Sequence, residues 1–248
     1  MDKVEILGVA IDNVSYQEAV ERIRTFLRSP HQHYVVTPNP EFLVTAQIDA
    51  PFRQILNYAD LTVADGVGLI HAARWLGKRL QRTTGVDLFW NLCELAQREV
   101  LPIFLLGGGE GVATATAAVL TKYFPKLIVS GTESGGAVSA EGNSTDDGQL
   151  IFTINQAKPM LLFVAFGCPK QEKWIFRHLD QLPSVKVAMG VGGSFDFISG
   201  HVTRAPEVLR SLGLEWLYRL IKEPWRWKRI YTAVVIFPFL VLRQKLKM

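Results

Sequence analysis

Short, strongly apolar runs separated by amphipathic stretches are the feature that most constrains the fold of this 248-residue chain. The runs occupy residues 4–11, 34–37, 61–64, 103–106, 127–131, 160–166 and 186–191. Runs of this length and composition are typical of strands buried on both faces, which occur in parallel sheets covered by helices. We therefore expect an α/β fold with a mostly parallel sheet and helices on both of its faces.

The stretches between these runs carry helix signals. Ser15 and Glu18 form a capping box, which predicts a helix from that point to about Leu27. Further helices are expected from about residue 41, over 68–76, 86–99, 111–123 and 147–156, and from about residue 170. Residues 134–148 are rich in Gly, Ser, Asn and Asp, and are predicted to form a mobile loop.

Polar residues directly follow several of the predicted strands. Ligands of open parallel sheets bind at the carboxyl ends of the strands, so these residues should converge on one rim. The candidate segments are 37–40, 65–66, 107–110, 167–171 and 192–196.

Asp65 and Arg82 are two candidates at this rim. The Asp65 carboxylate could act as a general base toward a substrate hydroxyl, but Asp is also a good helix N-cap, and spacing alone favours the cap. Arg82 could hold a phosphate through paired hydrogen bonds, although a lone arginine is more often a solvated surface residue.

Two turns could contact an anion. The glycines at 107–109 lie between a strand and a helix, where the backbone can approach a phosphate. Val112 breaks the dinucleotide fingerprint and there is no P-loop, so a tight structural turn and a nucleotide contact stay equally open. A nicotinamide-dependent oxidoreductase is the alternative function that this turn supports. Lys170 and Gln171 lie beside the expected N-terminus of another helix, near any bound anion.

Metal and redox signals are weak. The five histidines lack ligand spacing, and Cys93 and Cys168 lie far apart in different predicted elements. Two buried thiols in a reducing compartment are expected. We predict no catalytic metal and no cofactor.

The C-terminal residues differ from the rest of the chain in charge. Residues 204–248 hold ten Lys/Arg against three Asp/Glu, whereas residues 1–203 hold seventeen against twenty. We therefore divide the chain into a core over 1–203 and a basic appendage over 204–248 that has an anionic partner. On one helix, Arg219, Lys222, Arg226 and Arg229 would share an arc of roughly 80°. Pro224 is expected to break or kink this helix, so the shared facing is approximate.

Residues 231–242 form a nearly all-apolar run with cations on both flanks. The run is too short to span a bilayer, and Pro238 is expected to interrupt it, so an interfacial segment on an anionic membrane is expected. The alternatives are a core helix or an oligomer contact, and nucleic acid is weaker because no binding motif accompanies the charge. A non-catalytic membrane adaptor is a second alternative function. The chain shows neither a signal peptide nor an apolar run of about 18 residues, so no transmembrane helix is expected.

A series of motifs in fixed order then suggests a family. The motifs are Thr37-Pro38-Asn39, Asp65-Gly66-x-Gly68, Arg82-x-x-Gly85, Gly167-x-Pro169-Lys170-Gln171-Glu172-x-Trp174, residues 190–196, Arg204-Ala205-Pro206 and residues 212–224. Over essentially the whole length, this chain resembles the WecG/TagA/CpsF glycosyltransferases (glycosyltransferase family 26). One departure is Thr83-Thr84, where relatives carry a hydrophobic residue and a small one, and this leaves the local packing open.

The resemblance implies a Rossmann-like core and an inverting, metal-independent transfer of N-acetylmannosamine or its uronic acid. The donor would be a UDP-sugar, and the acceptor an undecaprenyl-diphosphate-linked GlcNAc. The product would enter a bacterial surface polymer such as teichoic acid, common antigen, capsule or exopolysaccharide. The enzyme would be cytoplasmic and peripheral on the inner face of the plasma membrane, with its oligomeric state open, a homo-oligomer included.

The resemblance also implies residue roles. Asp65 would be the base that deprotonates the acceptor hydroxyl. The sugars would be positioned by Thr37, Asn39 and Gln171, the diphosphate contacted by Arg82, and the uridine by Asp196. In the appendage, Arg219, Arg226 and Arg229 would offset the charge on the UDP leaving group.

Overall fold

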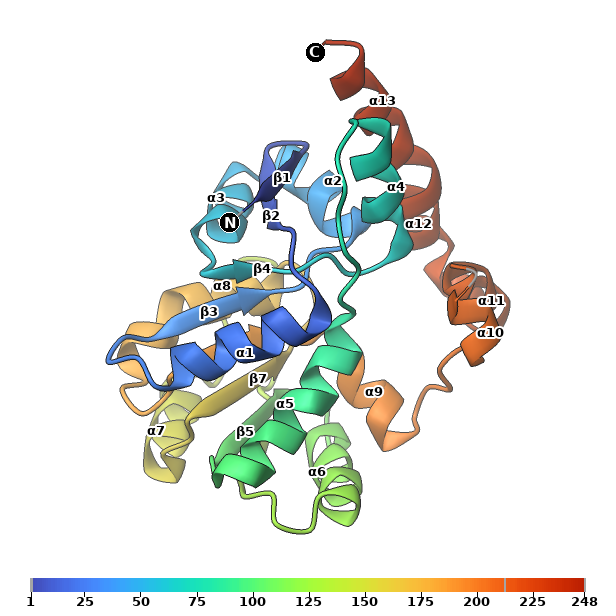
Figure 1. The fold of residues 1–248 in the computed structure, drawn as a ribbon. Helices are drawn as coiled ribbons and strands as arrows, with labels where there is room; N and C mark the ends of the chain where they lie inside the picture. Colours follow the sequence, from blue (N-terminus) through green and yellow to red (C-terminus); the bar gives the residue numbers. More distant parts are fainter. Residues whose placement is uncertain (1, 212, 248) are drawn as a thin grey trace.

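The centre of the molecule is a six-stranded sheet in which every described strand pair is parallel. The computed structural model describes residues 2–211 and 213–247. The strand order is β4-β3-β8-β7-β5-β6 (Figure 1). The strands are β3 (His33–Val36), β4 (Leu61–Thr62), β5 (Ile103–Gly107), β6 (Val129–Glu133), β7 (Leu161–Ala165) and β8 (Val187–Gly190). The predicted α/β fold is confirmed.

Both faces of this sheet are buried, which explains its uniformly apolar strands. Along β7, Leu161 and Phe163 belong to one core cluster, whereas Leu162 and Val164 belong to another on the opposite face. All four side chains are fully buried. Because successive strand residues point to opposite faces, burial of both faces demands apolar residues at every position.

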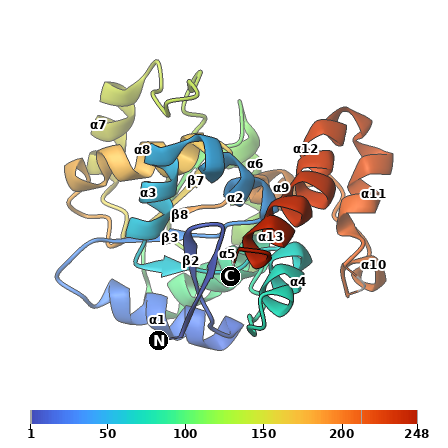
Figure 2. The same cartoon turned by 90° about the horizontal axis from the view of Figure 1, so that it is seen from above.

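Helices cover the two faces in separate layers (Figure 2). One layer contains α1 (Tyr16–Leu27), α5 (Gly85–Glu99), α6 (Val112–Tyr123) and α9 (Ser194–Ser199). The other side contains α2 (Pro40–Ile48), α3 (Ala50–Tyr58), α7 (Asp147–Ala157) and α8 (Lys170–His178), which the short η1 (Leu179–Gln181) follows. Helix α4 (Val67–Trp75) shares their core cluster but lies above the sheet in Figure 1, beside the C-terminal helices. The capping box at the start of α1 is confirmed: the Glu18 N–H donates to Ser15 Oγ at 3.3 Å, and the Ser15 N–H donates to Glu18 Oε2 at 2.7 Å.

The single strand predicted over residues 4–11 is wrong. The segment forms an antiparallel hairpin of β1 (Lys3–Ile6) and β2 (Val9–Asp12), separate from the main sheet. The turn residues Leu7 and Gly8 both have positive φ, 51° and 76°, and positive φ at both turn positions suits the twist of a tight hairpin. Leucine rarely adopts this conformation, and the usual sequence signal for such a turn is Asn-Gly. Because Leu7 stands where that signal has Asn, the sequence did not reveal the turn.

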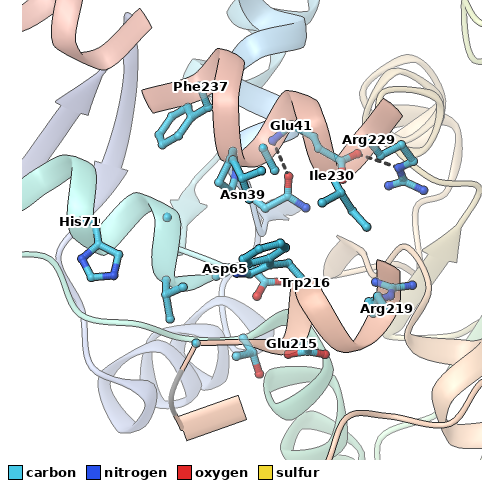
Figure 3. Close-up of a pocket in the computed structure, with 18 of the residues that line it drawn as sticks. Asn39, Glu41, Asp65, His71, Glu215, Trp216, Arg219, Arg229, Ile230 and Phe237 are labelled. Carbon is cyan, nitrogen blue, oxygen red and sulfur yellow. Dashed lines mark hydrogen bonds and ion pairs between the residues drawn. The ribbon is translucent and has the colours of Figure 1, made fainter. Parts of the chain in front are cut away.

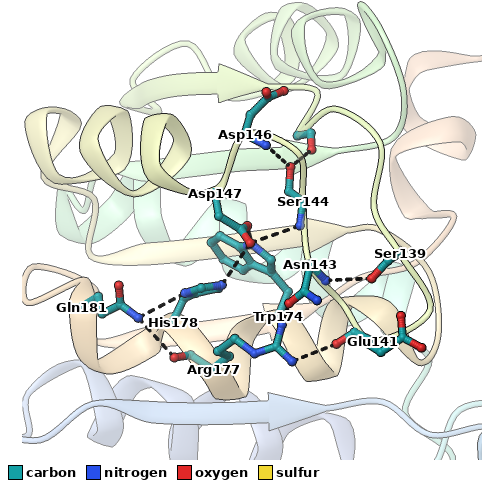
Figure 4. A network of polar contacts seen from close by, with 11 residues as sticks. Ser139, Glu141, Asn143, Ser144, Asp146, Asp147, Trp174, Arg177, His178 and Gln181 are labelled. Carbon is teal, nitrogen blue, oxygen red and sulfur yellow. Dashed lines mark hydrogen bonds and ion pairs between the residues drawn. The ribbon is translucent and has the colours of Figure 1, made fainter.

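The predicted mobile loop over residues 134–148 is instead held on α8 and the start of α7 (Figure 4). Lys170 Nζ donates to the Val138 carbonyl at 2.6 Å. Asp147 accepts a hydrogen bond from Trp174 Nε1 at 2.6 Å and another from the Ser144 N–H at 3.1 Å. The polar composition that suggested mobility therefore supplies partners to a helix that lies far along the chain.

The C-terminal arm (residues 204–211 and 213–247) runs along one side of the body (Figure 1). Its elements are α10 (Glu207–Ser211), α11 (Glu215–Lys222), η2 (Pro224–Arg226), α12 (Trp227–Tyr231), η3 (Thr232–Ile236) and α13 (Phe237–Lys245). The predicted break at Pro224 is confirmed, because α11 ends at Lys222. Among the described residues, no helix combines the length and apolar character needed to cross a bilayer.

The predicted interruption at Pro238 is wrong, because the chain stays helical through it. Pro238 occupies the first turn of α13, where its missing N–H is tolerated. The preceding η3 is a π-helix, in which the Phe237 N–H donates to the Thr232 carbonyl five residues back. Phe237 and Val241 are fully buried in the same core as α2 and α4, and α13 lies beside α4 in both views (Figures 1 and 2). The arm is therefore anchored in the body.

Candidate active site

A cavity of about 540 Å³ lies between the carboxyl ends of β3 and β4, helix α4 and the C-terminal arm (Figure 3). The body contributes residues after β3, after β4, and from α4, α5 and α9, whereas the arm contributes residues from α11 through α13. Six of the predicted site residues line it: Asn39, Asp65, Arg82, Arg219, Arg226 and Arg229. Figure 3 places Asp65 between Arg219 and Arg229 on one side and His71 and Phe237 on the other.

Asp65 is held at the centre of this cavity by the backbone around it. Its N–H donates to the Pro38 carbonyl at 2.9 Å, which joins the ends of β3 and β4. The N-cap of α4 is Gly66, which forms no side-chain cap hydrogen bond, so the alternative of Asp65 as the helix cap is wrong. The carboxylate instead lies beside Gly85, whose N–H lowers its pKa.

The pKa of Asp65 is raised from 3.8 to about 6. Burial is the main cause, and the charges of Glu215 and Asp87 add to it. The Gly85 N–H and the Arg82 guanidinium oppose the shift. A carboxylate with this pKa is ionised near neutral pH and can still accept a proton during a reaction, as a general base must.

Three arginines of the arm face the cavity from ion pairs with buried or half-buried carboxylates. Arg219 and Arg226 share Glu223, with Nε to carboxylate distances of 3.1 and 2.9 Å. Arg229 Nε lies 2.7 Å from Glu41. Among the described residues, no hydrogen bond uses the terminal nitrogens of these three guanidiniums. Those nitrogens are therefore available to an anionic ligand in the cavity.

Two further arginines, Arg82 and Arg204, line the same cavity. Arg82 donates from Nη1 to the Arg210 carbonyl at 3.1 Å and lies 3.9 Å from Glu215. Arg204 pairs with Asp87 at 2.7 Å. Arg82 therefore contacts the arm through both Arg210 and Glu215. The alternative that Arg82 is a freely solvated surface residue is wrong.

Asn39 and Thr37 belong to the loop that follows β3. Asn39 is the N-cap of α2, and its Oδ1 accepts from the Glu41 N–H at 2.9 Å and the Phe42 N–H at 3.3 Å. Its NH2 group is therefore the part left for a ligand. Thr37 is buried directly behind Asp65: a Cβ at Gly85 would lie 3.0 Å from Thr37 Oγ1 and 3.4 Å from Asp65 Oδ2.

Gln171 lies at the same rim but not in the cavity lining. Only 1% of it is exposed, and its Oε1 accepts from the N–H groups of Gly167 and Gly192 at 3.1 and 3.0 Å. Its Nε2 donates to Glu172 Oε1 at 2.6 Å. Burial raises the pKa of Glu172 to about 8. In this structure Gln171 joins the turns after β7 and β8.

Asp196 lies within the electrostatic influence of Arg219 and Arg226 of the arm. It is half-buried in α9, and burial raises its pKa, while the charges of Arg226 and Arg219 oppose the rise. It is not among the described residues that line the cavity, although its neighbour Phe197 is. The Arg219 guanidinium lies 5.0 Å from the centre of the Phe197 ring.

Sequence reasoning missed the acidic partners of the arginines, Glu41, Glu215 and Glu223. The spacing of Glu223, four residues after Arg219 and three before Arg226, was the available signal. None of the glycines at 107–109, in the turn after β5, is among the described residues that line the cavity. A Cβ at Gly107 would lie 2.7 Å from the Ala165 carbonyl carbon, so this position has no room for a side chain, as a tight turn requires.

The positive charge of the cavity comes from its five arginines. In the part of the chain that the structure describes, no three His, Cys, Asp or Glu side chains gather in a way that could hold a metal ion. A carboxylate with a raised pKa, placed among arginines at the carboxyl edge of a parallel sheet, defines an enzyme that acts on a negatively charged substrate.

The chain belongs to the glycosyl transferase WecG/TagA/CpsF family, whose model matches residues 4–248. A relative from Staphylococcus aureus strain MRSA252 is named N-acetylglucosaminyldiphosphoundecaprenol N-acetyl-beta-D-mannosaminyltransferase. The two sequences are 35% identical over an alignment of 250 residues, which covers 99% of this chain and 94% of the relative. Relatives of the same name from strains MW2 and NCTC 8325 are each 34% identical with the same coverage.

These comparisons confirm the resemblance of the sequence motifs, and the chain is a glycosyltransferase. They lend no support to the alternatives of an oxidoreductase or a non-catalytic adaptor.

Proposed function

We propose that this glycosyltransferase moves N-acetylmannosamine from a UDP-sugar to N-acetylglucosaminyl-diphosphoundecaprenol, with inversion at the anomeric carbon. The names of the Staphylococcus aureus relatives support the acceptor and the sugar. The observation that carries the chemistry is the place of Asp65, in a cavity whose arm side presents Arg219, Arg226 and Arg229. The product would enter a cell-surface polymer.

In this mechanism Asp65 accepts the proton of the attacking hydroxyl. The acceptor oxygen forms a bond to the anomeric carbon while the bond from that carbon to the diphosphate oxygen breaks. UDP leaves with the bonding electrons, and the proton remains on Asp65 until solvent removes it. Because the pKa of Asp65 is about 6, the carboxylate is mostly ionised at neutral pH and ready to act as the base.

The arginines of the arm would stabilise the departing diphosphate. Negative charge grows on the leaving oxygen as the bond breaks, and fixed guanidiniums favour that transition state. Their pairing through Nε leaves two terminal nitrogens on each side chain, a geometry that suits paired bonds to phosphate oxygens.

The other predicted residues have supporting roles in this proposal. Arg82 would contact a diphosphate, and the Asn39 amide would donate to a sugar hydroxyl. Thr37 and Gln171 would position the sugars from behind the cavity surface, by fixing the turns that carry the site. Asp196 would contact the uridine beside the arginines of the arm.

A panel of UDP-sugars tests this proposal against a water-soluble GlcNAc-diphosphate acceptor, with products identified by mass spectrometry. We expect transfer of N-acetylmannosamine, and the panel includes the uronic acid and glucose. Asp65→Ala should lower kcat by about 100-fold or more, since general bases contribute 10²–10⁴. More than a tenth of the wild-type kcat in Asp65→Ala would remove Asp65 from the role of base.

We also propose that the arm docks on the inner face of the plasma membrane. Its outer surface exposes aromatic and aliphatic side chains beside cations, a pattern typical of interfacial helices: Trp225, Trp227, Tyr231, Phe239 and Leu242, with Lys228, Arg243 and Lys245. Deletion of the arm is a poor test, because it would remove Phe237 and Val241 from the core.

Two matched substitutions test the docking instead. Phe239 on the arm is 64% exposed, and Phe152 on α7 is 59% exposed. Phe239→Glu should abolish sedimentation with vesicles that contain anionic lipid, whereas Phe152→Glu should sediment as the wild type does. Equal sedimentation of the two variants would refute docking through the arm.

A further inference from the structure

The cavity has two chemically different ends, and the mechanism above uses one of them. The end toward Arg219 and Arg229 is charged, and Asp65 lies between it and the other end (Figure 3). The other end is walled mainly by apolar side chains from two elements: Ala72 and Trp75 of α4, with His71 on the same helix, and Val234, Phe237 and Pro238 of the arm.

The apolar end borders exposed apolar residues of the arm. Val234 lines the cavity and is still 37% exposed, while the next residue, Val235, is 45% exposed and belongs to the outer surface. Phe239 and Leu242 continue that surface along α13. A hydrocarbon chain that leaves the cavity at Val234 would therefore meet exposed apolar side chains of the arm.

This arrangement matches one kind of ligand. A nucleotide or a sugar fits the apolar end poorly, because its polar groups would be buried there without hydrogen-bond partners. A molecule with a diphosphate at one end and a hydrocarbon chain at the other satisfies both ends of the cavity. We propose that the apolar end, between α4 and residues 234–238, binds the first isoprene units of the polyprenyl acceptor. This inference rests on the proposed function.

Chain-length dependence in solution tests this subsite apart from the membrane. Two water-soluble acceptors would be compared without detergent or vesicles: GlcNAc-diphosphate with a methyl group, and GlcNAc-diphosphate with a geranyl group. Burial of several methylene and methyl groups should raise kcat/KM of wild type for the geranyl acceptor by about tenfold or more over the methyl acceptor. The ratio of the two values does not depend on the fraction of active enzyme.

Val234→Trp and Val235→Trp form a matched pair of variants. Both variants add the same indole to the same π-helix. Val234 is one of the described residues that line the cavity, whereas Val235 is not. Val234→Trp should fill the apolar end and reduce the geranyl-to-methyl ratio to below about threefold. Val235→Trp should keep the wild-type ratio.

Three results would overturn the subsite. A wild-type ratio near one would show that the cavity does not bind the chain. An equal loss of the ratio in both variants would assign the effect to the outer surface. Transfer to neither acceptor, from any donor in the panel, would overturn the proposed function and the subsite with it, and this outcome is distinct from the first two.

Discussion

Replacement of Asp65 by asparagine should abolish transfer and yet stabilise the folded protein at neutral pH. The amide introduced by Asp65→Asn has the same shape as the carboxylate, and its oxygen can still face the Gly85 N–H. The amide carries no charge, so the burial that raises the pKa of Asp65 no longer penalises the fold. The buried carboxylate that serves as the base therefore lowers the free energy of unfolding. Such a trade between activity and stability is common at active sites.

The magnitude follows from the pKa. Asp65 has a pKa of about 6 in the folded protein, against an ordinary value of 3.8. A difference of about two pH units corresponds to about 3 kcal/mol. Because the carboxylate is partly accessible to solvent through the cavity, we expect about 1–3 kcal/mol, or a rise in Tm of roughly 2–10 °C.

The sign of the pH dependence is definite. Below pH 3.8 Asp65 is neutral in both the folded and the unfolded protein, so its charge contributes nothing to the difference between wild type and variant. As the pH rises from about 4 to about 6, the unfolded chain releases this proton first, and the wild type loses stability relative to Asp65→Asn. Above about pH 6 the difference stays constant.

Thermal and urea unfolding of both proteins from pH 4 to pH 8 would measure this difference. The control is Asp146→Asn, at an exposed aspartate before α7, which should shift stability little at any pH. A lower Tm for Asp65→Asn than for wild type at pH 7.5 would refute the reasoning. So would a stability difference that does not change with pH.

Three further outcomes are expected. The kcat/KM of wild type should fall tenfold per pH unit below about pH 6 and level off above it, because the base must be ionised; a profile flat down to pH 4.5 would contradict this. Glu223→Gln should lower kcat about tenfold or more, because the two arginines that it pairs lose their fixed positions, whereas the exposed Glu207→Gln should not. Asp147→Ala should lower the free energy of unfolding by about 1–3 kcal/mol in urea, because the buried Trp174 N–H loses its acceptor.

The parallel sheet was predictable because its physical cause is local. Every position of β7 is apolar, and only burial on both faces requires that. The helix at Tyr16–Leu27 was predictable for a similar reason, since its capping box lies within four consecutive residues. The hairpin at Leu7-Gly8 was not, because its turn depends on a leucine in a conformation that the sequence does not signal.

The site was predictable only in part. The rule that ligands bind at strand ends selected Asp65, and the charge of the arm selected its arginines. Neither rule could show that Gln171 is buried away from the cavity, or that Glu223 and Glu41 hold the arginines in place. Those contacts join segments far apart along the chain or depend on the break at Pro224.

The sequence alone therefore determined the layered fold, the edge of the sheet that bears the polar residues, and the membership of the family, because periodicity and motif order are properties of neighbouring residues. Only the tertiary structure decided that α13 anchors the arm in the core, that Asp65 has a raised pKa, and that the cavity has a charged and an apolar end. Burial and electrostatic interaction depend on distances in space, and those exist only once the arm has packed against α4.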